Sequence, residues 1–148
     1  MSRWPGKAKS QRTRFGGLSR SELMSRVCSR GNRTTEEKLI LLLREAGIGG
    51  WRRHSLLFGR PDFVWRKARV AVFVDGCFWH GHACGRNLSP KTNVGAWREK
   101  IRHNKARDSC VTRYLRQHGW RVCRIWECSL SKHPCSCINR IEKALKEL

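Results

Sequence analysis

The feature that most constrains this chain is an apolar segment followed directly by closely spaced cysteine and histidine residues. Residues 70–74 are all apolar, which predicts a buried β-strand. The next ten residues contain four side chains that commonly bind metal ions: Cys77, His80, His82 and Cys84. Thiolate and imidazole ligands at this spacing are typical of tetrahedral zinc. We therefore expect a loop tied by a metal ion, with three local ligands and a fourth from a distant part of the chain.

The charge of the chain indicates a polyanionic partner. Its 148 residues include 32 Lys and Arg but only 11 Asp and Glu, which gives a formal net charge of +21. Such an excess attracts nucleic acid, the commonest polyanion, and a membrane surface is the alternative. No apolar run approaches the roughly 20 residues that span a bilayer, and the N-terminus lacks the apolar core of a signal peptide. We therefore expect a cytoplasmic protein with no membrane partner.

The eight cysteines allow two interpretations. Disulfides would place the chain outside the cell, whereas metal-bound thiolates suit a reducing cytosol. The alternation of cysteine with histidine and the absence of a signal sequence favour the second. Cys135 and Cys137 could capture a second metal ion or compete for the first. The cysteines for which the sequence predicts no definite role are Cys28, Cys110, Cys123, Cys135 and Cys137.

The first 33 residues differ in composition from the rest of the chain. They hold nine basic residues and one acidic residue, and they contain too few apolar side chains to bury a core alone. Ser19 and Glu22 have capping-box spacing, which predicts a short helix through Met24 and Val27. We expect residues 1–33 to form a basic, partly helical arm that contacts the polyanion.

Residues 34–148 are expected to fold as a single domain, because a chain of this length suffices for one core but not for two. Apolar periodicity and breaker residues divide it into elements in the order α-β-β-α-β-α. That order predicts an α/β fold with a mixed central sheet flanked by helices. The expected helices are residues 34–46, 97–118 and 136–148, and the expected strands are residues 62–65, 70–74 and 121–126.

The helix expected at residues 97–118 carries polar side chains on its apolar face. A buried carboxylate without a partner is costly, so Asp108 requires a bound cation, a hydrogen-bond network or access to water. A salt bridge to a neighbouring arginine is an equal alternative. The inward positions step by three and four along the helix and are Trp97, Ile101, Asn104, Asp108, Val111 and Leu115.

Two further carboxylates are expected to face inward. Glu36 shares the apolar face of the first helix, and Asp62 follows a proline at the start of a strand. If they meet Asp108, the three form a set that suits Mg²⁺, which prefers oxygen ligands and supports phosphodiester hydrolysis. His80 lies on the rigid loop and could accept a proton from the attacking water. Proline–aspartate at a strand start is also typical of restriction-type nucleases, although the acidic-x-lysine element that accompanies it is absent here.

Four motifs together carry a specific resemblance. They lie at residues 59–62 (GRPD), 72–84 (VFVDGCFWHGHAC), 97–108 (a Trp-Lys-Ile-Asn-Arg-Asp series) and 119–128 (GWRVCRIWEC). In this order they resemble the very-short-patch-repair (Vsr) mismatch endonuclease family, from about Met24 to Cys128. The resemblance implies a restriction-endonuclease-like fold, a structural zinc ion and Mg²⁺-dependent nicking of DNA 5′ to the thymine of a T·G mismatch, which arises by deamination of 5-methylcytosine.

The resemblance assigns catalytic roles to particular positions. Asp62 becomes the principal Mg²⁺ ligand, joined by the backbone carbonyl of Val74, where the family usually has threonine. Valine has the same backbone carbonyl as threonine, so the replacement is compatible with activity, whereas any role of the threonine side-chain hydroxyl is lost. His80 becomes the general base or a group that organises the attacking water. The supporting positions are Glu36 on the first helix together with Asn104 and Asp108.

The resemblance also assigns metal and DNA contacts. Phe78, Trp79 and Trp97 become wedges that insert into the duplex beside the mismatch, and core packing is the alternative for the first two. Met24 and Arg26 become DNA contacts from the arm. The implied zinc ligands are Cys77, His82, Cys84 and Cys128. The tryptophans expected in the protein core are Trp51, Trp65 and Trp120.

Three function classes stay open on the sequence. The first is a mismatch-nicking repair endonuclease that acts as a monomer on double-stranded DNA, with a functional link to a cytosine-5 DNA methyltransferase. The second is a restriction or mobile-element endonuclease of different specificity on the same core. The third is a non-catalytic zinc module that binds DNA. Nicking of T·G versus T·A duplexes separates the first two, and loss of cleavage but not of binding in EDTA separates both from the third.

Overall fold

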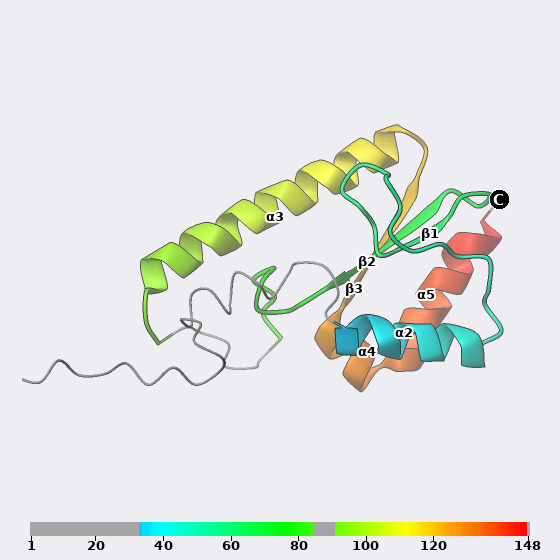
Figure 1. Cartoon of the computed structure of the whole chain (residues 1–148), viewed down its shortest axis with the longest axis horizontal. Coiled ribbons are helices and arrows are strands. Elements are labelled where there is room, and N and C mark those ends of the chain that lie inside the picture. The colour runs from blue at the N-terminus through cyan, green and yellow to red at the C-terminus, as the bar shows by residue number, and fades with distance from the viewer. Residues whose placement is uncertain (1–32, 85–90, 148) are drawn as a thin grey trace, which may run out of the picture. The chain divides into compact units, whose positions relative to one another are not determined.

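The computed structural model describes residues 33–84 and 91–147. Apart from Arg33, the expected basic arm, with Met24, Arg26 and Cys28, lies outside the described residues. The elements labelled in Figure 1 are α2 (Arg33–Glu45), β1 (Phe63–Trp65), β2 (Val70–Asp75), α3 (Val94–Gln117), β3 (Arg121–Trp126), α4 (Glu127–Lys132) and α5 (Pro134–Lys146).

The expected strands and long helices are all present, and their boundaries differ from the expected ones by at most three residues. The last helix begins at Pro134 rather than at residue 136, because proline fits the first turn of a helix, where its missing N–H is not needed. The short helix α4 was not expected. It has six residues and follows β3 without a break, so it offers too little length for a periodic pattern to show.

The three strands form one mixed sheet in the order β1-β2-β3. β1 runs antiparallel to β2, with Val64 opposite Ala71, and β2 runs parallel to β3, with Val72 opposite Cys123. Parallel neighbours require a long crossover connection, and α3 supplies it. The expectation of an α/β fold with a mixed sheet flanked by helices is confirmed.

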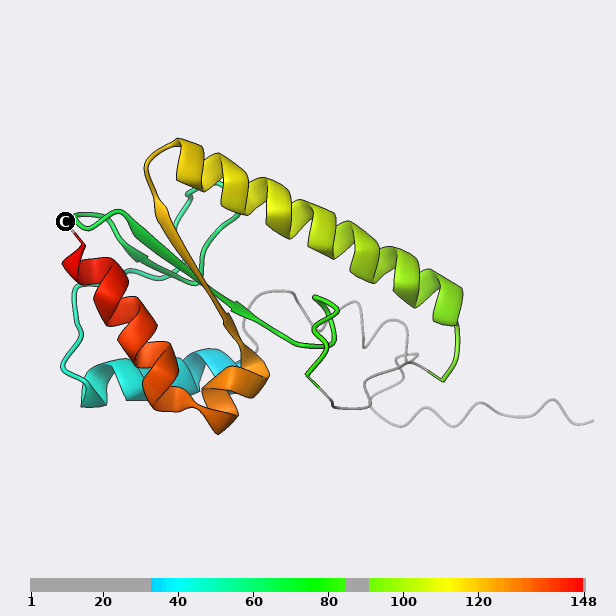
Figure 2. The same cartoon turned by 180° about the vertical axis from the view of Figure 1, so that it is seen from behind.

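Helices cover both faces of the sheet (Figures 1 and 2). The larger core lies between one face and α2, α4 and α5, and the smaller core lies between the other face and α3. Because side chains alternate along a strand, Val70 and Val72 of β2 enter the larger core, whereas Ala71 and Phe73 enter the smaller one. The same alternation places Asp75, the last residue of β2, on the face that α3 covers.

Of the three tryptophans expected in the core, Trp65 lies within it, and Trp51 and Trp120 are partly buried against it. Trp65 is buried, and Trp51 packs edge-on against Phe63 with ring centroids 5.3 Å apart. Trp120 packs against the smaller core. None of the helices in the described ranges is long and apolar enough to cross a membrane.

Candidate active site and metal centre

Four side chains from two distant segments meet just beyond the end of β2. The ligand atoms of Cys77, His82, Cys84 and Cys128 all lie within 4.8 Å of one another. Sγ of Cys128 is 3.4 Å from Nδ1 of His82. Ligand atoms around a tetrahedral zinc ion stand about 3.5–3.8 Å apart, so this set fits one such ion with little movement. The structure thus brings together the four expected residues as a group that could bind a metal ion.

Backbone geometry and one aromatic contact shape this loop. The N–H of His82 donates a hydrogen bond of 2.9 Å to the carbonyl of Cys77. Gly81 adopts a φ of +60°, and a Cβ there would come within 2.6 Å of the side chain of Ile101 on α3, so glycine is required. The ring of His82 stacks on Trp126, with centroids 4.1 Å apart and planes 5° from parallel. The strand that delivers the fourth cysteine therefore also orients the histidine.

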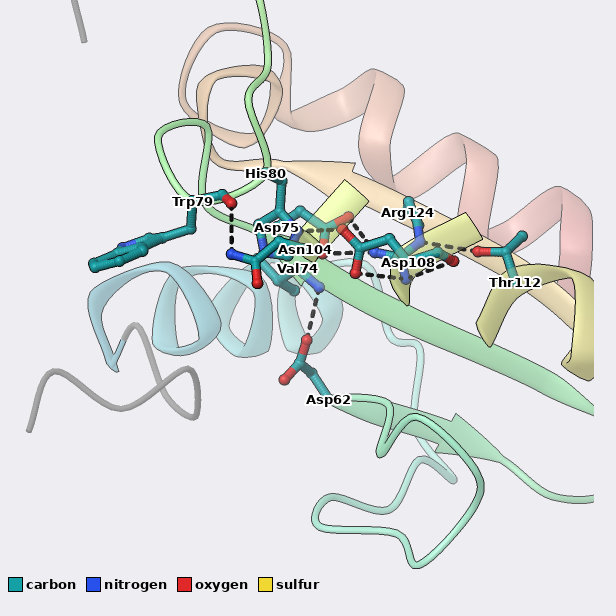
Figure 3. Close-up of polar contacts among 9 residues, drawn as sticks. All are labelled: Asp62, Val74, Asp75, Trp79, His80, Asn104, Asp108, Thr112 and Arg124. Carbon is teal, nitrogen blue, oxygen red and sulfur yellow. Dashed lines mark hydrogen bonds and ion pairs between the residues drawn. The ribbon is translucent and has the colours of Figure 1, made fainter. Parts of the chain in front are cut away.

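Asp62 lies beside β2 immediately before β1 (Figure 3). Its Oδ2 accepts a hydrogen bond of 2.7 Å from the backbone N–H of Val74. Burial raises the pKa of Asp62 to about 7; the Val74 N–H opposes the rise, and the Glu36 and Asp75 carboxylates add to it. A cation stabilises the ionised form of a carboxylate in such surroundings. The position therefore suits a divalent ion that prefers oxygen ligands.

Glu36 faces inward, as expected, and is only 5% exposed. It forms an ion pair with Arg53 from the irregular segment between α2 and β1. That arginine lies 5.9 Å from the centroid of the Phe63 ring, and no sequence pattern identifies it as the partner of Glu36. Because the charge of Glu36 contributes to the raised pKa of Asp62, these two expected carboxylates face the same region.

His80 is held between two carboxylates (Figure 3). Its Nδ1 is hydrogen-bonded to Oδ2 of Asp108, and its Nε2 is 3.7 Å from Oδ1 of Asp75. Burial lowers the pKa of His80, but the Asp108 hydrogen bond and the two carboxylate charges outweigh this effect, so the pKa is raised. With the Nδ1 proton engaged by Asp108, Nε2 is the nitrogen left to accept a proton.

α3 supplies the groups that hold the loop around His80. Nδ2 of Asn104 donates a hydrogen bond of 2.8 Å to the carbonyl of Trp79, and Asp108 binds the ring of His80. Asp108 also lies 3.4 Å from Nη2 of Arg124, so the hydrogen-bond network and the arginine salt bridge expected as alternatives are both present. The three expected carboxylates thus form two groups, with Glu36 near Asp62 and Asp108 at His80.

Asp75 and Arg124 are two site residues that the sequence reasoning missed. Asp75 is 3% exposed, and both of its oxygens accept hydrogen bonds from Arg124, at 2.9 and 2.7 Å. Burial raises the pKa of Asp75, and the arginine opposes this rise. The signal available in the sequence was the position of Asp75, since strand alternation puts it on the same face as Ala71 and Phe73.

The three aromatic residues expected to contact DNA form one cluster. The ring centroids of Phe78, Trp79 and Trp97 lie 5.3 to 5.6 Å apart in each pairing. The ammonium of Lys100 lies 5.0 Å from the ring centroid of Trp79 and 5.6 Å from that of Trp97. The three rings are partly exposed and belong to neither hydrophobic core, so packing in a core does not explain them.

The remaining described cysteines occupy different environments. Cys123 and Cys137 are buried in the larger core, whereas Cys110 and Cys135 are exposed. Cys137 therefore does not share its surroundings with Cys135. Neither joins a group of three or more potential metal ligands within the described residues, and the expected second metal capture by this pair finds no support.

A groove of about 750 Å³ opens beside His80 between the loop after β2, α3 and β3. Its basic walls suit a negatively charged ligand, since positive charge lining a concave surface raises the local concentration of anions. The charged and titratable residues that line it include Asp75, His80, Lys105, Asp108, Arg113 and Arg116.

Comparison with known proteins matches these observations. A family model described as DNA mismatch endonuclease Vsr matches residues 14–86. The type II nicking enzyme V.XorIIP of Xanthomonas oryzae pv. oryzae is 39% identical over 112 residues, which cover 76% of this chain and 82% of that protein. The DNA mismatch endonuclease Vsr of Escherichia coli is 38% identical over 112 residues, which cover 76% of this chain and 71% of that protein. The type II nicking enzyme V.HpaIIP of Haemophilus parainfluenzae is 34% identical over 119 residues, which cover 78% of this chain and 84% of that protein.

The region matched by the family model includes part of the site. The family model spans Asp62 and the loop that carries three of the four potential metal ligands. Relatives align over most of the chain and over most of their own lengths. The resemblance inferred from the four motifs is thereby confirmed, and this chain belongs to the DNA mismatch endonuclease Vsr family.

Proposed function

We propose that this protein is a Mg²⁺-dependent DNA endonuclease that nicks one strand of a duplex 5′ to the thymine of a T·G mismatch. The names of its relatives, DNA mismatch endonuclease and type II nicking enzyme, support this assignment. The observation that carries it is the position of His80: Asp108 binds its Nδ1, and it lies on the loop that follows β2, the strand that Asp62 contacts at Val74. We further propose that the sheet is of the restriction-endonuclease type, with Asp62 placed before its first strand.

The chain's own residues suit each part of hydrolysis. The carboxylate of Asp62 and the backbone carbonyl of Val74 would hold Mg²⁺, with Glu36 adding negative charge nearby. When bound, such an ion stabilises charge on the phosphate and lowers the pKa of a coordinated water. His80 accepts a proton at Nε2, and Asp108 stabilises the imidazolium that results.

The potential metal cluster suits a structural zinc ion. Four protein ligands complete a tetrahedral shell and leave no open position for substrate. The ion would tie the loop after β2 to the start of α4, where Cys128 lies. In that arrangement it would fix His80 and the neighbouring aromatic residues on a rigid support.

The aromatic cluster suits recognition of the mismatch by deformation. A T·G pair remains hydrogen-bonded, so direct readout of base edges discriminates it less well than a test of local stacking. Inserting apolar side chains between base steps costs a few kcal/mol of unstacking, and less where stacking is already disturbed. Phe78, Trp79 and Trp97 lie together and partly exposed, as such wedges require.

The remaining proposed partners follow from the net charge of the chain and from the origin of the T·G mismatch. The excess of basic residues suits double-stranded DNA, and residues 1–33, with Met24 and Arg26, would add contacts from the arm. We propose that the protein acts as a monomer on DNA. A cytosine-5 DNA methyltransferase would be its functional companion, because deamination of 5-methylcytosine produces the T·G pair.

Nicking of matched and mismatched duplexes tests the proposal. Purified protein should nick a T·G duplex in Mg²⁺, spare the T·A duplex, and bind without cleaving when Mg²⁺ is omitted. Asp62→Asn should abolish nicking and retain DNA affinity, and His80→Ala should slow nicking by roughly 10²–10⁴-fold. Glu142→Gln, a partly buried position on α5, serves as the control. Near-normal turnover by Asp62→Asn in Mg²⁺ would remove Asp62 from the site.

The same assay examines a second function. Several relatives are named type II nicking enzymes, which keeps open a restriction or mobile-element endonuclease of different specificity. Equal nicking of T·G and T·A duplexes would favour that function. Binding without cleavage under any condition would instead indicate a non-catalytic DNA-binding module.

A further inference from the structure

We propose that Arg124 is a positioning residue that fixes the orientation of the His80 ring by holding the carboxylates on both sides of it. The inference rests on the proposed function of His80 as the base. Arg124 lies in β3, whereas the carboxylates of Asp75 and Asp108 come from β2 and α3. One guanidinium therefore connects the three elements that surround the histidine (Figure 3).

The contacts of Arg124 use most of its donors. Its Nη1 donates to both oxygens of Asp75, at 2.9 and 2.7 Å. Its Nη2 lies 3.4 Å from Oδ1 and 3.5 Å from the backbone carbonyl of Asp108. Its Nε donates to the hydroxyl of Thr112, one turn further along α3, at 3.1 Å. The guanidinium also lies 4.5 Å from the ring centroid of Phe73, so its plane is fixed as well.

Stability does not account for a charged group at this place. Arg124 stands opposite Phe73 in the sheet, between Cys123 and Ile125, which enter the larger core. An apolar residue facing α3 would extend the smaller core, and replacing a buried ion pair by packed apolar groups is commonly neutral or stabilising. The hydrogen bonds from Arg124 instead fix the positions of its partners, because the planar guanidinium sets both the distance and the plane of the groups that it binds.

The first consequence concerns Asp108. One of its oxygens meets Arg124 and the other binds Nδ1 of His80. A carboxylate held at both oxygens cannot rotate freely, so the direction of the bond to His80 is set. The arginine thereby orients the ring through Asp108 without touching it.

The second consequence concerns Asp75. Its Oδ1 lies only 3.7 Å from Nε2 of His80, close enough for a small movement to make a hydrogen bond. Arg124 holds both Asp75 oxygens and keeps that carboxylate in place. In this way Nε2 stays available to the attacking water, and the proton of the neutral ring stays on Nδ1.

Arg124→Lys provides the sharpest test, because lysine keeps the positive charge beside Asp75 but cannot make the forked contacts. We expect the single-turnover nicking rate of T·G duplexes to fall by roughly 10–100-fold, as for a misplaced catalytic group. DNA affinity and thermal stability should stay near the wild-type values. Arg140→Lys, on the exposed face of α5, is the matched control and should nick at the wild-type rate.

The double variant Asp75→Asn with Arg124→Met separates positioning from folding. It removes the buried carboxylate of Asp75 together with its partly buried arginine partner, and Asp108 keeps its hydrogen bond to His80, so the variant should fold and still lose nicking rate. A wild-type single-turnover rate in this variant or in Arg124→Lys would overturn the inference. A fall in nicking rate that is accompanied by a large fall in melting temperature would also overturn it, because the loss of activity would then follow from loss of folding.

Nitrogen NMR of the His80 ring gives a readout that does not depend on nicking. In ¹⁵N-histidine-labelled protein, with the His80 signals assigned from His80→Gln, the neutral ring should carry its proton on Nδ1. Arg124→Lys should shift the population toward the Nε2-protonated form, and unchanged nitrogen shifts would contradict the proposal. If wild-type protein nicks no duplex, the proposed function fails, whereas these shifts still decide the role of Arg124.

Discussion

Asn104 donates a hydrogen bond of 2.8 Å from its side-chain amide to the backbone carbonyl of Trp79. One turn further along α3, Asp108 binds the ring of His80. The helix therefore holds two consecutive loop residues, of which one belongs to the aromatic cluster and the other to the proposed catalytic group. Movement of α3 would displace both together, so the structure couples the proposed recognition of the mismatch to the proposed chemistry.

Asn104→Ala should weaken this coupling. The variant leaves the partly buried carbonyl of Trp79 without its partner, which costs about 1–3 kcal/mol of folding stability. We expect a lower melting temperature and a lower ratio of nicking rates on T·G and T·A duplexes. Asn139→Ala, at an exposed position of α5, is the control. A variant that loses stability but keeps the wild-type ratio would show that the bond serves folding alone.

Trp79→Ala and Trp97→Ala should reduce discrimination between T·G and T·A duplexes more than they reduce nonspecific DNA affinity. The reason is that the basic surface supplies affinity, whereas the rings would report on stacking. Nicking-rate ratios and salt-dependent binding to a matched duplex measure the two effects. An unchanged ratio in both variants would leave the cluster without a role in recognition.

Trp65→Ala offers the contrast to these variants. Trp65 is 5% exposed, and its indole N–H donates a hydrogen bond of 2.8 Å to the carbonyl of Gly49. Its loss should cost about 3–5 kcal/mol of folding stability. Trp79→Ala and Trp97→Ala, which alter the partly exposed cluster, should lose much less folding stability.

Periodicity accounts for what the sequence predicted about the fold. β2 is an unbroken apolar run, and α3 repeats apolar residues by three and four, so both follow from local pattern alone. The members of the potential metal cluster were predictable for another reason, since thiols and imidazoles at this density have few uses besides metal binding. Its fourth member, Cys128, was expected from the family resemblance rather than from spacing.

The pairing of charged side chains is the part of the site that could least be predicted from the sequence. Arg53 pairs with Glu36 across 17 positions, and Arg124 pairs with Asp75 across 49. The chain has 32 basic residues, and every carboxylate has many candidate partners at the level of sequence. Only the sheet register, which places β3 beside β2, selects Arg124.

The buried thiol of Cys123 should react slowly with alkylating reagents. Burial raises its pKa, so the reactive thiolate forms only at higher pH than for an ordinary cysteine, and the side chain is 8% exposed. At pH 8, iodoacetamide should label the exposed Cys110 and Cys135 well before Cys123. Peptide mass spectrometry gives the order, and equal labelling rates would contradict the buried position.

Cys128→Ala should remove the metal ion and most of the folding stability. The thiol lies 3.4 Å from His82 and belongs to the cluster whose other members lie 44 to 51 positions earlier in the chain. A structural zinc ion contributes its binding energy to folding, so loss of one ligand should release the loop from α4 and leave His80 unsupported. Wild-type protein should contain one zinc per chain by elemental analysis, and a strong chelator should lower its melting temperature. Cys135→Ala, an exposed cysteine outside the cluster, should keep both the metal and the wild-type stability. A Cys128→Ala protein that retains one zinc and melts at the wild-type temperature would exclude a structural role for this cluster.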